Sequence, residues 1–195
     1  MSGGVRNVTV NNCTFLGTDV GLRFKSTRGR GGVVENIAIE NVRMLDIATD
    51  AIRFNMFYGG RAPLPEDNGD EGEVEPLAEP VNEGTPSFRK IRIRNVLCCG
   101  ANRAIWLQGL PEMPIQEVTL EDVQITSDQG VTCIDADHLR FKNVTIEPNK
   151  GHAFWLFNSR NILMDGVKTL VDPNQVIKLS GSKTRAIVYN GETLR

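Results

Sequence analysis

The chain has 195 residues and a formal net charge of −2, with 40% apolar and 24% charged residues. This length and composition fit one domain with a sizeable core and exclude global disorder. No run of 18 apolar residues exists, so no transmembrane helix is predicted, and neither a membrane nor a nucleic acid is expected as a partner.

The four cysteines, Cys13, Cys98, Cys99 and Cys133, show neither metal-ligand spacing nor the framework of a small disulfide-rich protein. Cys98 and Cys99 are adjacent, and neighbouring strand positions face opposite ways, so these two are poor disulfide partners. We therefore expect buried free thiols, no metal site and no cofactor.

A repeated nine-residue segment is the strongest signal in the sequence. VRNVTVNNC at 5–13 recurs as VENIAIENV at 34–42, FRKIRIRNV at 88–96 and IQEVTLEDV at 115–123, with weaker copies at 138–144 and 161–167. The first apolar residues of the copies are separated by 29, 54, 27, 21 and 23 residues, and the interval of 54 is one coil plus an insertion. A period in the twenties, built of short strands, predicts a solenoid.

The repeats favour an all-β, right-handed parallel β-helix among the solenoids. No repeated helix or leucine framework is present, as a leucine-rich repeat would need, and each unit holds short β-branched runs broken by Gly, Asn and Asp. Asn tolerates left-handed backbone at turns, and stacked Asn amides can hydrogen-bond along a column. The predicted column consists of Asn12, Asn41, Asn95, Asp122 and Asn143.

A second series of strands runs in step with the first, at 21–25, 51–55, 104–108, 131–135, 153–157 and 176–180. In most members the second and fourth residues are apolar and are expected to point inward, so the third and fifth face outward. The outward residues are Arg23, Arg53, Trp106, Cys133, Trp155 and Lys178 at the third position, and Lys25, Asn55, Gln108, Asp135, Phe157 and Ser180 at the fifth. Cations, amides and aromatic rings on one face suit an extended, anionic, sugar-like polymer. The residues for which we predict ligand contacts are Arg23, Lys25, Arg53, Asn55 and Trp106.

The segment 59–87 interrupts the repeats and is predicted to be an acidic, Pro/Gly-rich loop insertion. It carries eight acidic residues and one arginine, a net charge of −7 that leaves about +5 for the coils. We expect residues 1–195 to form a single parallel β-helix domain around it.

The segment GLRFKS at 21–26, followed by GRGGVVENI at 29–37, resembles the Arg-hydrophobic-Lys region of family 28 glycoside hydrolases, the polygalacturonases. DAIRFNM at 50–56 and GLPEMPI at 109–115 are similar to the bacterial branch of that family. The resemblance covers essentially the whole chain. It implies a parallel β-helix that hydrolyses α-1,4 links between the galacturonic acids of pectin with inversion, in which Arg23 and Lys25 bind a substrate carboxylate.

Three further motifs of that family, Asn-Thr-Asp, Asp-Asp and Gly-His-Gly, are absent from this sequence. In the family they lie on the coils just before the Arg-Lys strand, so we expect the chain to be the C-terminal portion of a longer enzyme and to be inactive alone. Inverting hydrolysis needs an acid and a base roughly 6.5–9.5 Å apart. Thr18-Asp19 and Thr49-Asp50 are interpreted as turn residues, so no catalytic residue is assigned.

Two other functions stay open. A non-catalytic acidic-polysaccharide-binding or structural β-helix module needs only the outward arginines and tryptophans. A pectate lyase would use an arginine as base and clustered acids to hold calcium, and no outward acid cluster accompanies Arg23. Exo or endo action, homogalacturonan or rhamnogalacturonan as substrate, the role of the acidic loop and the oligomeric state do not follow from the sequence.

The family resemblance also implies a periplasmic or secreted protein, although no signal peptide stands at the start of this chain. A first coil without a cap would expose the core and an unpaired strand edge. We therefore expect self-association through the N-terminal edge, beside binding of galacturonan or its oligomers.

Overall fold

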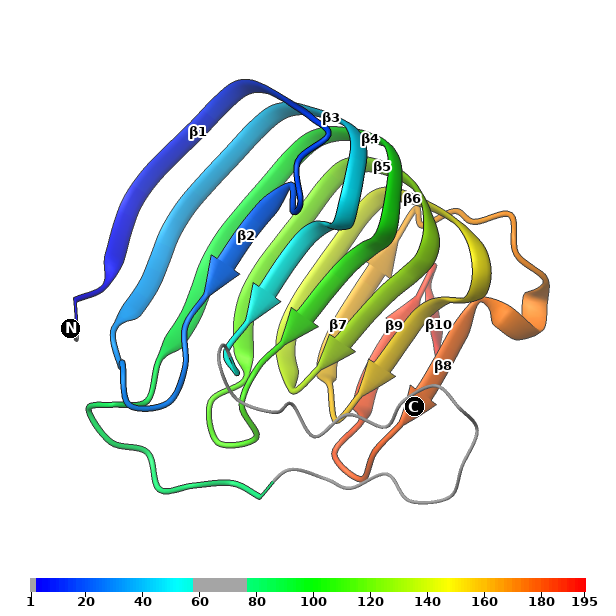
Figure 1. Ribbon diagram of the computed structural model, residues 1–195. Coiled ribbons are helices and arrows are strands. Elements are labelled where there is room, and N and C mark those ends of the chain that lie inside the picture. Colours follow the sequence, from blue (N-terminus) through cyan, green and yellow to red (C-terminus); the bar gives the residue numbers. More distant parts are fainter. Residues whose placement is uncertain (1–2, 58–76) are drawn as a thin grey trace.

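The computed structural model describes residues 3–57 and 77–195, and within them the chain winds into a right-handed parallel β-helix (Figure 1). The strands are β1 (Val5–Leu16), β2 (Leu22–Lys25), β3 (Val33–Asn55), β4 (Ser87–Gln108), β5 (Ile115–Ile134), β6 (Ala136–Phe157), β7 (Arg160–Asp165), β8 (Ile177–Ser180), β9 (Arg185–Tyr189) and β10 (Glu192–Thr193). A single turn of 3₁₀-helix, η1 (Pro173–Gln175), precedes β8. Within the described ranges no helix is long and apolar enough to cross a membrane.

Much of the predicted insertion at 59–87 lies outside the described residues. Its described part, 77–86, contains no strand, and β4 begins at Ser87.

Each coil pairs in parallel with the next, in the order β1, β3, β4, β5, β6, β7 and β9, with β2 beside β3 and β8 beside β6. The first apolar residues of the repeats lie in one row, as predicted: Val8, Ile37, Ile91, Val118, Leu139 and Ile162. The pairing across the interval of 54 residues is β3 with β4, which confirms that this interval is one coil with an insertion.

The predicted Asn column adopts left-handed backbone at every coil. The five residues from Asn12 to Asn143 have φ between 52° and 57°. The amide of Asn95 donates to the Asn41 side-chain oxygen at 2.6 Å, and Asn143 donates to Asp122 at 2.6 Å, whereas Asn41 donates to Asn11 at 2.8 Å. A second left-handed column, which the sequence analysis did not identify, bends the coils at Asn7, Asn36, Lys90, Glu117, His138 and Asn161.

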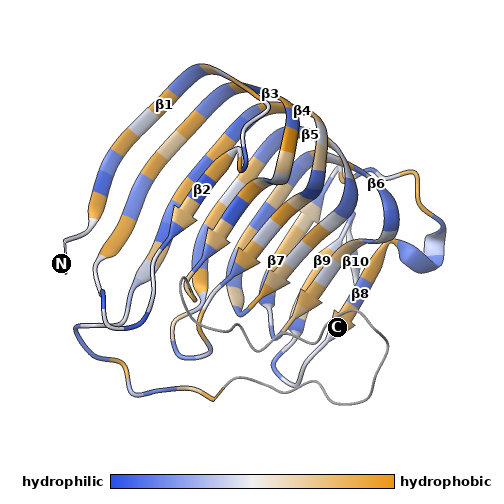
Figure 2. Cartoon of the chain, in the orientation of Figure 1, coloured by the Kyte–Doolittle hydropathy of each residue, from blue (hydrophilic) through white to orange (hydrophobic). Residues whose placement is uncertain are grey.

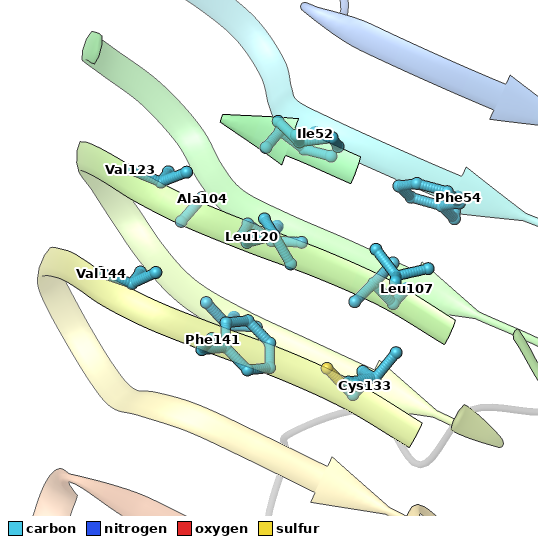
Figure 3. Packing of buried hydrophobic residues seen from close by; sticks show 14 of the residues in the cluster. Ile52, Phe54, Ala104, Leu107, Leu120, Val123, Cys133, Phe141 and Val144 are labelled. Carbon is cyan, nitrogen blue, oxygen red and sulfur yellow. The ribbon is translucent and has the colours of Figure 1, made fainter. Parts of the chain in front are cut away.

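The core consists of stacked rows of apolar side chains between the strands, and hydropathy alternates along each strand accordingly (Figure 2, Figure 3). Phe24 stacks on Phe54 of the next coil with ring centroids 4.1 Å apart, and Phe141 meets Phe154 edge-on at 5.5 Å. Like side chains in one row contact each other through successive coils, so burial of each row depends on the strand register.

The predicted register of one coil was wrong by one residue. Val131, not Thr132, pairs with Ile105, so Thr132 faces outward and Cys133 points into the core (Figure 3). Asp135 follows β5 and is not in the outward row. Gly130 lies in line with Ala104 and Ala153 of the neighbouring coils. A Cβ at Gly130 would lie 2.4 Å from the Ala153 carbonyl oxygen.

All four cysteines are free, as predicted, but two of them are not buried. Cys98 and Cys133 lie in the core, where burial raises the pKa of both thiols. Cys99 is exposed because it lies in an outward row with Leu45. Cys13 lies in the inward row with Val42, but it is only half-buried because β1 pairs with a neighbouring coil on one side only.

The two ends of the solenoid differ. At the C-terminal end β10 turns back antiparallel to β9, whereas every other strand pairing among the described residues is parallel. At the other end β1 leaves Val5, Val8 and Leu16 exposed beside a groove of about 400 Å³. Self-association through this edge stays a prediction.

We expect Asn41→Val to lower the free energy of unfolding by about 2–4 kcal/mol, measured by urea denaturation. A β-branched residue is strained in left-handed backbone, and the change also removes the side-chain hydrogen bonds to Asn11 and Asn95. Asn41→Gly should cost less, because Gly accepts the backbone conformation. Thr9→Val, at an exposed extended position, should stay within about 0.5 kcal/mol of wild type. Equal losses for Val and Gly would contradict the backbone argument.

Candidate polysaccharide-binding face

The second series of strands forms a column made of β2, the C-terminal ends of β3 to β6, and β8 (Figure 1). We call its outward side chains the column face. One row of this face contains Arg23, Arg53, Trp106, Thr132, Trp155 and Lys178, and the other contains Lys25, Asn55, Gln108, Ile134, Phe157 and Ser180. Neither row contains an acidic residue, so the face itself is cationic.

Arg23 and Lys25 are exposed on β2, and their strand is anchored from the other side. Leu22 is buried, and Phe24 is stacked on Phe54. Parallel pairing places Arg53 next to Arg23 and Asn55 next to Lys25. The structure therefore brings four of the five predicted ligand residues together on adjacent strands about 4.8 Å apart.

A buried carboxylate lies at the corner of β3 that leads into this column. Asp50 is 2% exposed, forms an ion pair with Arg53 Nε, and has Arg103 Nη1 3.8 Å from its other oxygen. Burial raises the pKa of Asp50, although both guanidiniums oppose that shift. Burial also lowers the pKa of Arg103, against the favourable charge of Asp50. The interpretation of Thr49-Asp50 as turn residues was wrong, because both residues lie within β3, next to a shift in its register, and the Asp50 carboxylate holds two arginines on adjacent coils.

Trp106 points outward, as predicted, but its side chain is buried. The residue is 8% exposed, with the Arg103 guanidinium 4.3 Å from the ring centroid and with Ile134 and Phe157 packed beside it. Its ring nitrogen donates to Gln108 at 3.3 Å. Little of the ring is accessible for stacking on a sugar, so its ligand contact stays a prediction.

Trp155 and Asn55 are also fixed by neighbours. Trp155 is half-buried; its ring nitrogen donates to Ser180 Oγ at 2.8 Å, and Lys178 Nζ lies 4.7 Å from the ring centroid. The Asn55 side-chain oxygen accepts the Phe57 backbone N–H at 2.7 Å, which directs its amide nitrogen away from that contact.

An arginine clamp, Arg28 with Glu112, borders the end of the column. Arg28 Nε and Nη2 donate to the two carboxylate oxygens of Glu112 at 2.7 and 2.8 Å, and Arg28 Nη1 also lies 3.1 Å from Glu79. The guanidinium lies over the Phe57 ring at 5.3 Å. This clamp joins the loop after β2 to the turn between β4 and β5, two coils away. Gly31 in the same loop has φ +58° and approaches the Glu83 carbonyl too closely for a Cβ.

The sequence pattern predicts the outward cations but gives no sign that Asp50, Arg103, Arg28 and Glu112 belong to this region. Among the described residues, no three His, Cys, Asp or Glu side chains converge into a group that could hold a metal ion. The face therefore offers cation and amide contacts to an anionic ligand rather than a carboxylate cluster.

The fold and this face define a parallel β-helix with an outward cationic strand column. The family model described as glycosyl hydrolases family 28 matches residues 2–147, and the chain belongs to this family. That it falls in the bacterial branch stays a prediction.

Known relatives are similar to part of this chain. It is 26% identical over 125 residues to a probable polygalacturonase from Vitis vinifera, covering 64% of this chain and 22% of that protein. It is 26% identical to a polygalacturonase from Cryptomeria japonica (67% and 23%) and 28% identical to one from Prunus persica (63% and 28%). The matches thus span about a quarter of these relatives' lengths. No solved structure matches the chain.

We expect Glu112→Gln to lower the free energy of unfolding by about 1–3 kcal/mol at pH 7, because it leaves Arg28 with a weaker partner. Burial opposes ionisation of Glu112, but the hydrogen bonds and charge of Arg28 outweigh it, so the pKa of Glu112 lies below its usual 4.5. A depressed pKa stabilises the fold above pH 4.5, and this contribution is lost as the pH falls through the folded-state pKa.

The difference between wild type and Glu112→Gln should therefore shrink in urea denaturation series taken from pH 7 towards pH 3. Glu117→Gln, at an exposed position, is the matched control and should stay close to wild type throughout. A loss that does not change with pH would show that the Glu112 charge is not the stabilising element.

Proposed function

We propose that the chain binds galacturonan, the acidic polymer of pectin, and belongs to a polygalacturonase-type hydrolase that cleaves α-1,4-galacturonosyl links with inversion. The family membership and the three polygalacturonase relatives support this substrate class. The single observation that carries the proposal is the exposed pair Arg23 and Lys25, held outward on a strand whose opposite side carries the buried Leu22 and the half-buried Phe24.

These two residues would bind a uronate carboxylate. The Arg23 guanidinium can donate two parallel hydrogen bonds to a carboxylate, and Lys25 adds a second positive charge on the same strand side. Successive coils repeat the column every 4.8 Å or so, which suits a ligand that is itself a linear polymer. Because pectin is an extracellular polymer, we place the site of action in the periplasm or outside the cell.

We propose further that residues 1–195 do not hydrolyse the polymer by themselves. An inverting glycosidase needs one carboxylic acid to protonate the leaving oxygen and a carboxylate to activate water. The two rows of the column face contain no Asp or Glu, and the nearby Asp50 is engaged with Arg53 and Arg103. The same observation favours a second candidate function, a non-catalytic polysaccharide-binding module.

Calorimetric titration with trigalacturonate tests the binding proposal. We expect Arg23→Ala to weaken the affinity about 10- to 150-fold, the equivalent of the 1.5–3 kcal/mol typical of a hydrogen bond to a charged group. The matched control is Arg140→Ala, which removes an exposed arginine on another face and should leave the affinity unchanged. An unchanged affinity in Arg23→Ala would remove Arg23 from the ligand site.

An assay for new reducing ends on polygalacturonate separates hydrolysis from binding. We expect binding without product release by the 195-residue chain. Release of reducing ends would refute the proposed inactivity and the non-catalytic alternative together, while leaving the substrate class in place.

A further inference from the structure

Arg53 occupies the position next to Arg23 on the column face, but its guanidinium is held in a different way. Its Nε is paired with Asp50, which is almost fully buried behind it. Within the described ranges the two terminal nitrogens of Arg53 have no ion-pair or hydrogen-bond partner. The side chain is 28% exposed, so this end of the guanidinium reaches solvent.

Asp50 holds the Arg53 guanidinium in place from the buried side of the sheet. Its second oxygen faces Arg103, whose Nε donates to Gln129 at 3.1 Å and whose guanidinium lies over Trp106. A carboxylate bound through Nε leaves the Nη1–Nη2 edge of an arginine available, and that edge matches a second carboxylate in bidentate fashion. Like charges opposite each other on neighbouring strands destabilise a sheet, and Arg23 and Arg53 are such a pair. Two carboxylates of one ligand, one bound at Arg23 and the other at Arg53, would relieve this repulsion.

We propose that Arg53 binds a second carboxylate of the same acidic chain, one coil beyond Arg23 and Lys25, with Asp50 as the residue that positions it. This inference rests on the proposed function in that the ligand is a galacturonan. It adds that the ligand must be an oligomer, because a single uronate can occupy only one of the two positions. The sites lie on adjacent strands of one rigid sheet, so occupation of the first raises the local concentration of the next carboxylate at the second.

The test compares ligand length in calorimetric titrations of the full chain with mono-, di- and trigalacturonate. Wild type should bind the trimer about tenfold or more tightly than the monomer. Arg53→Ala should lose most of this gain while the monomer affinity stays unchanged, whereas Arg23→Ala should weaken both. Asp50→Asn should also lower the gain, and adding it to Arg53→Ala should cause no further loss, as expected for a residue that acts through Arg53.

Circular dichroism melts show which variants fold, and Arg140→Ala is the control for removing an arginine elsewhere. If Asp50→Asn does not fold, Arg53→Lys examines the same point, because it keeps the charge without the planar pair of nitrogens and should retain only part of the gain. A trimer gain that survives Arg53→Ala, with Arg23→Ala still impaired, would overturn this inference and leave the proposed function intact. A wild-type chain that binds none of the three ligands would overturn both.

Discussion

The backbone pairing of each coil with the next, in a fixed parallel register, is the constraint on which every other feature of this molecule depends. It requires all coils to bend at the same places, and two columns of left-handed residues meet that requirement. Asn or Asp fills all five positions of the column from Asn12 to Asn143 because both tolerate this conformation and can hydrogen-bond along the stack. When the bends of successive coils coincide, apolar side chains at equivalent positions stack on one another in the core.

The same register builds the column face. It places Arg53 beside Arg23 and Asn55 beside Lys25, although roughly 30 residues of chain separate the partners. Corner residues from successive coils also meet, which is how Asp50 comes to lie between Arg53 and Arg103. Burial strengthens the attraction between Asp50 and the arginines, but removing these charges from water costs a similar free energy. The ion pair is therefore better explained as orienting the arginines than as stabilising the fold.

The repeats in the sequence were sufficient to predict the fold and the outward cations. Periodic apolar residues such as Ile37 and Ile91 define the inward rows of the coils, and the alternation of side chains along each strand then defines the outward ones. The register of the coil at 131–135 was not readable from hydropathy, since Cys133 and Ile134 are both apolar and fit either face. The small residue Gly130, in line with Ala104 and Ala153, was the signal that could have fixed it. The contacts of Asp50 and of the clamp between Arg28 and Glu112 depend on the three-dimensional path of the corners and turns, which no local pattern encodes.

The connections between coils differ greatly in length, and this has an evolutionary consequence. Residues 56–86 join β3 to β4, whereas Asp135 alone joins β5 to β6, yet both pairs of strands keep the column in step. A lineage can therefore lengthen, shorten or replace one connection without disturbing the coils on either side. The column face and the connections that border it can therefore change independently, because the strand register holds the face whatever the length of a connection.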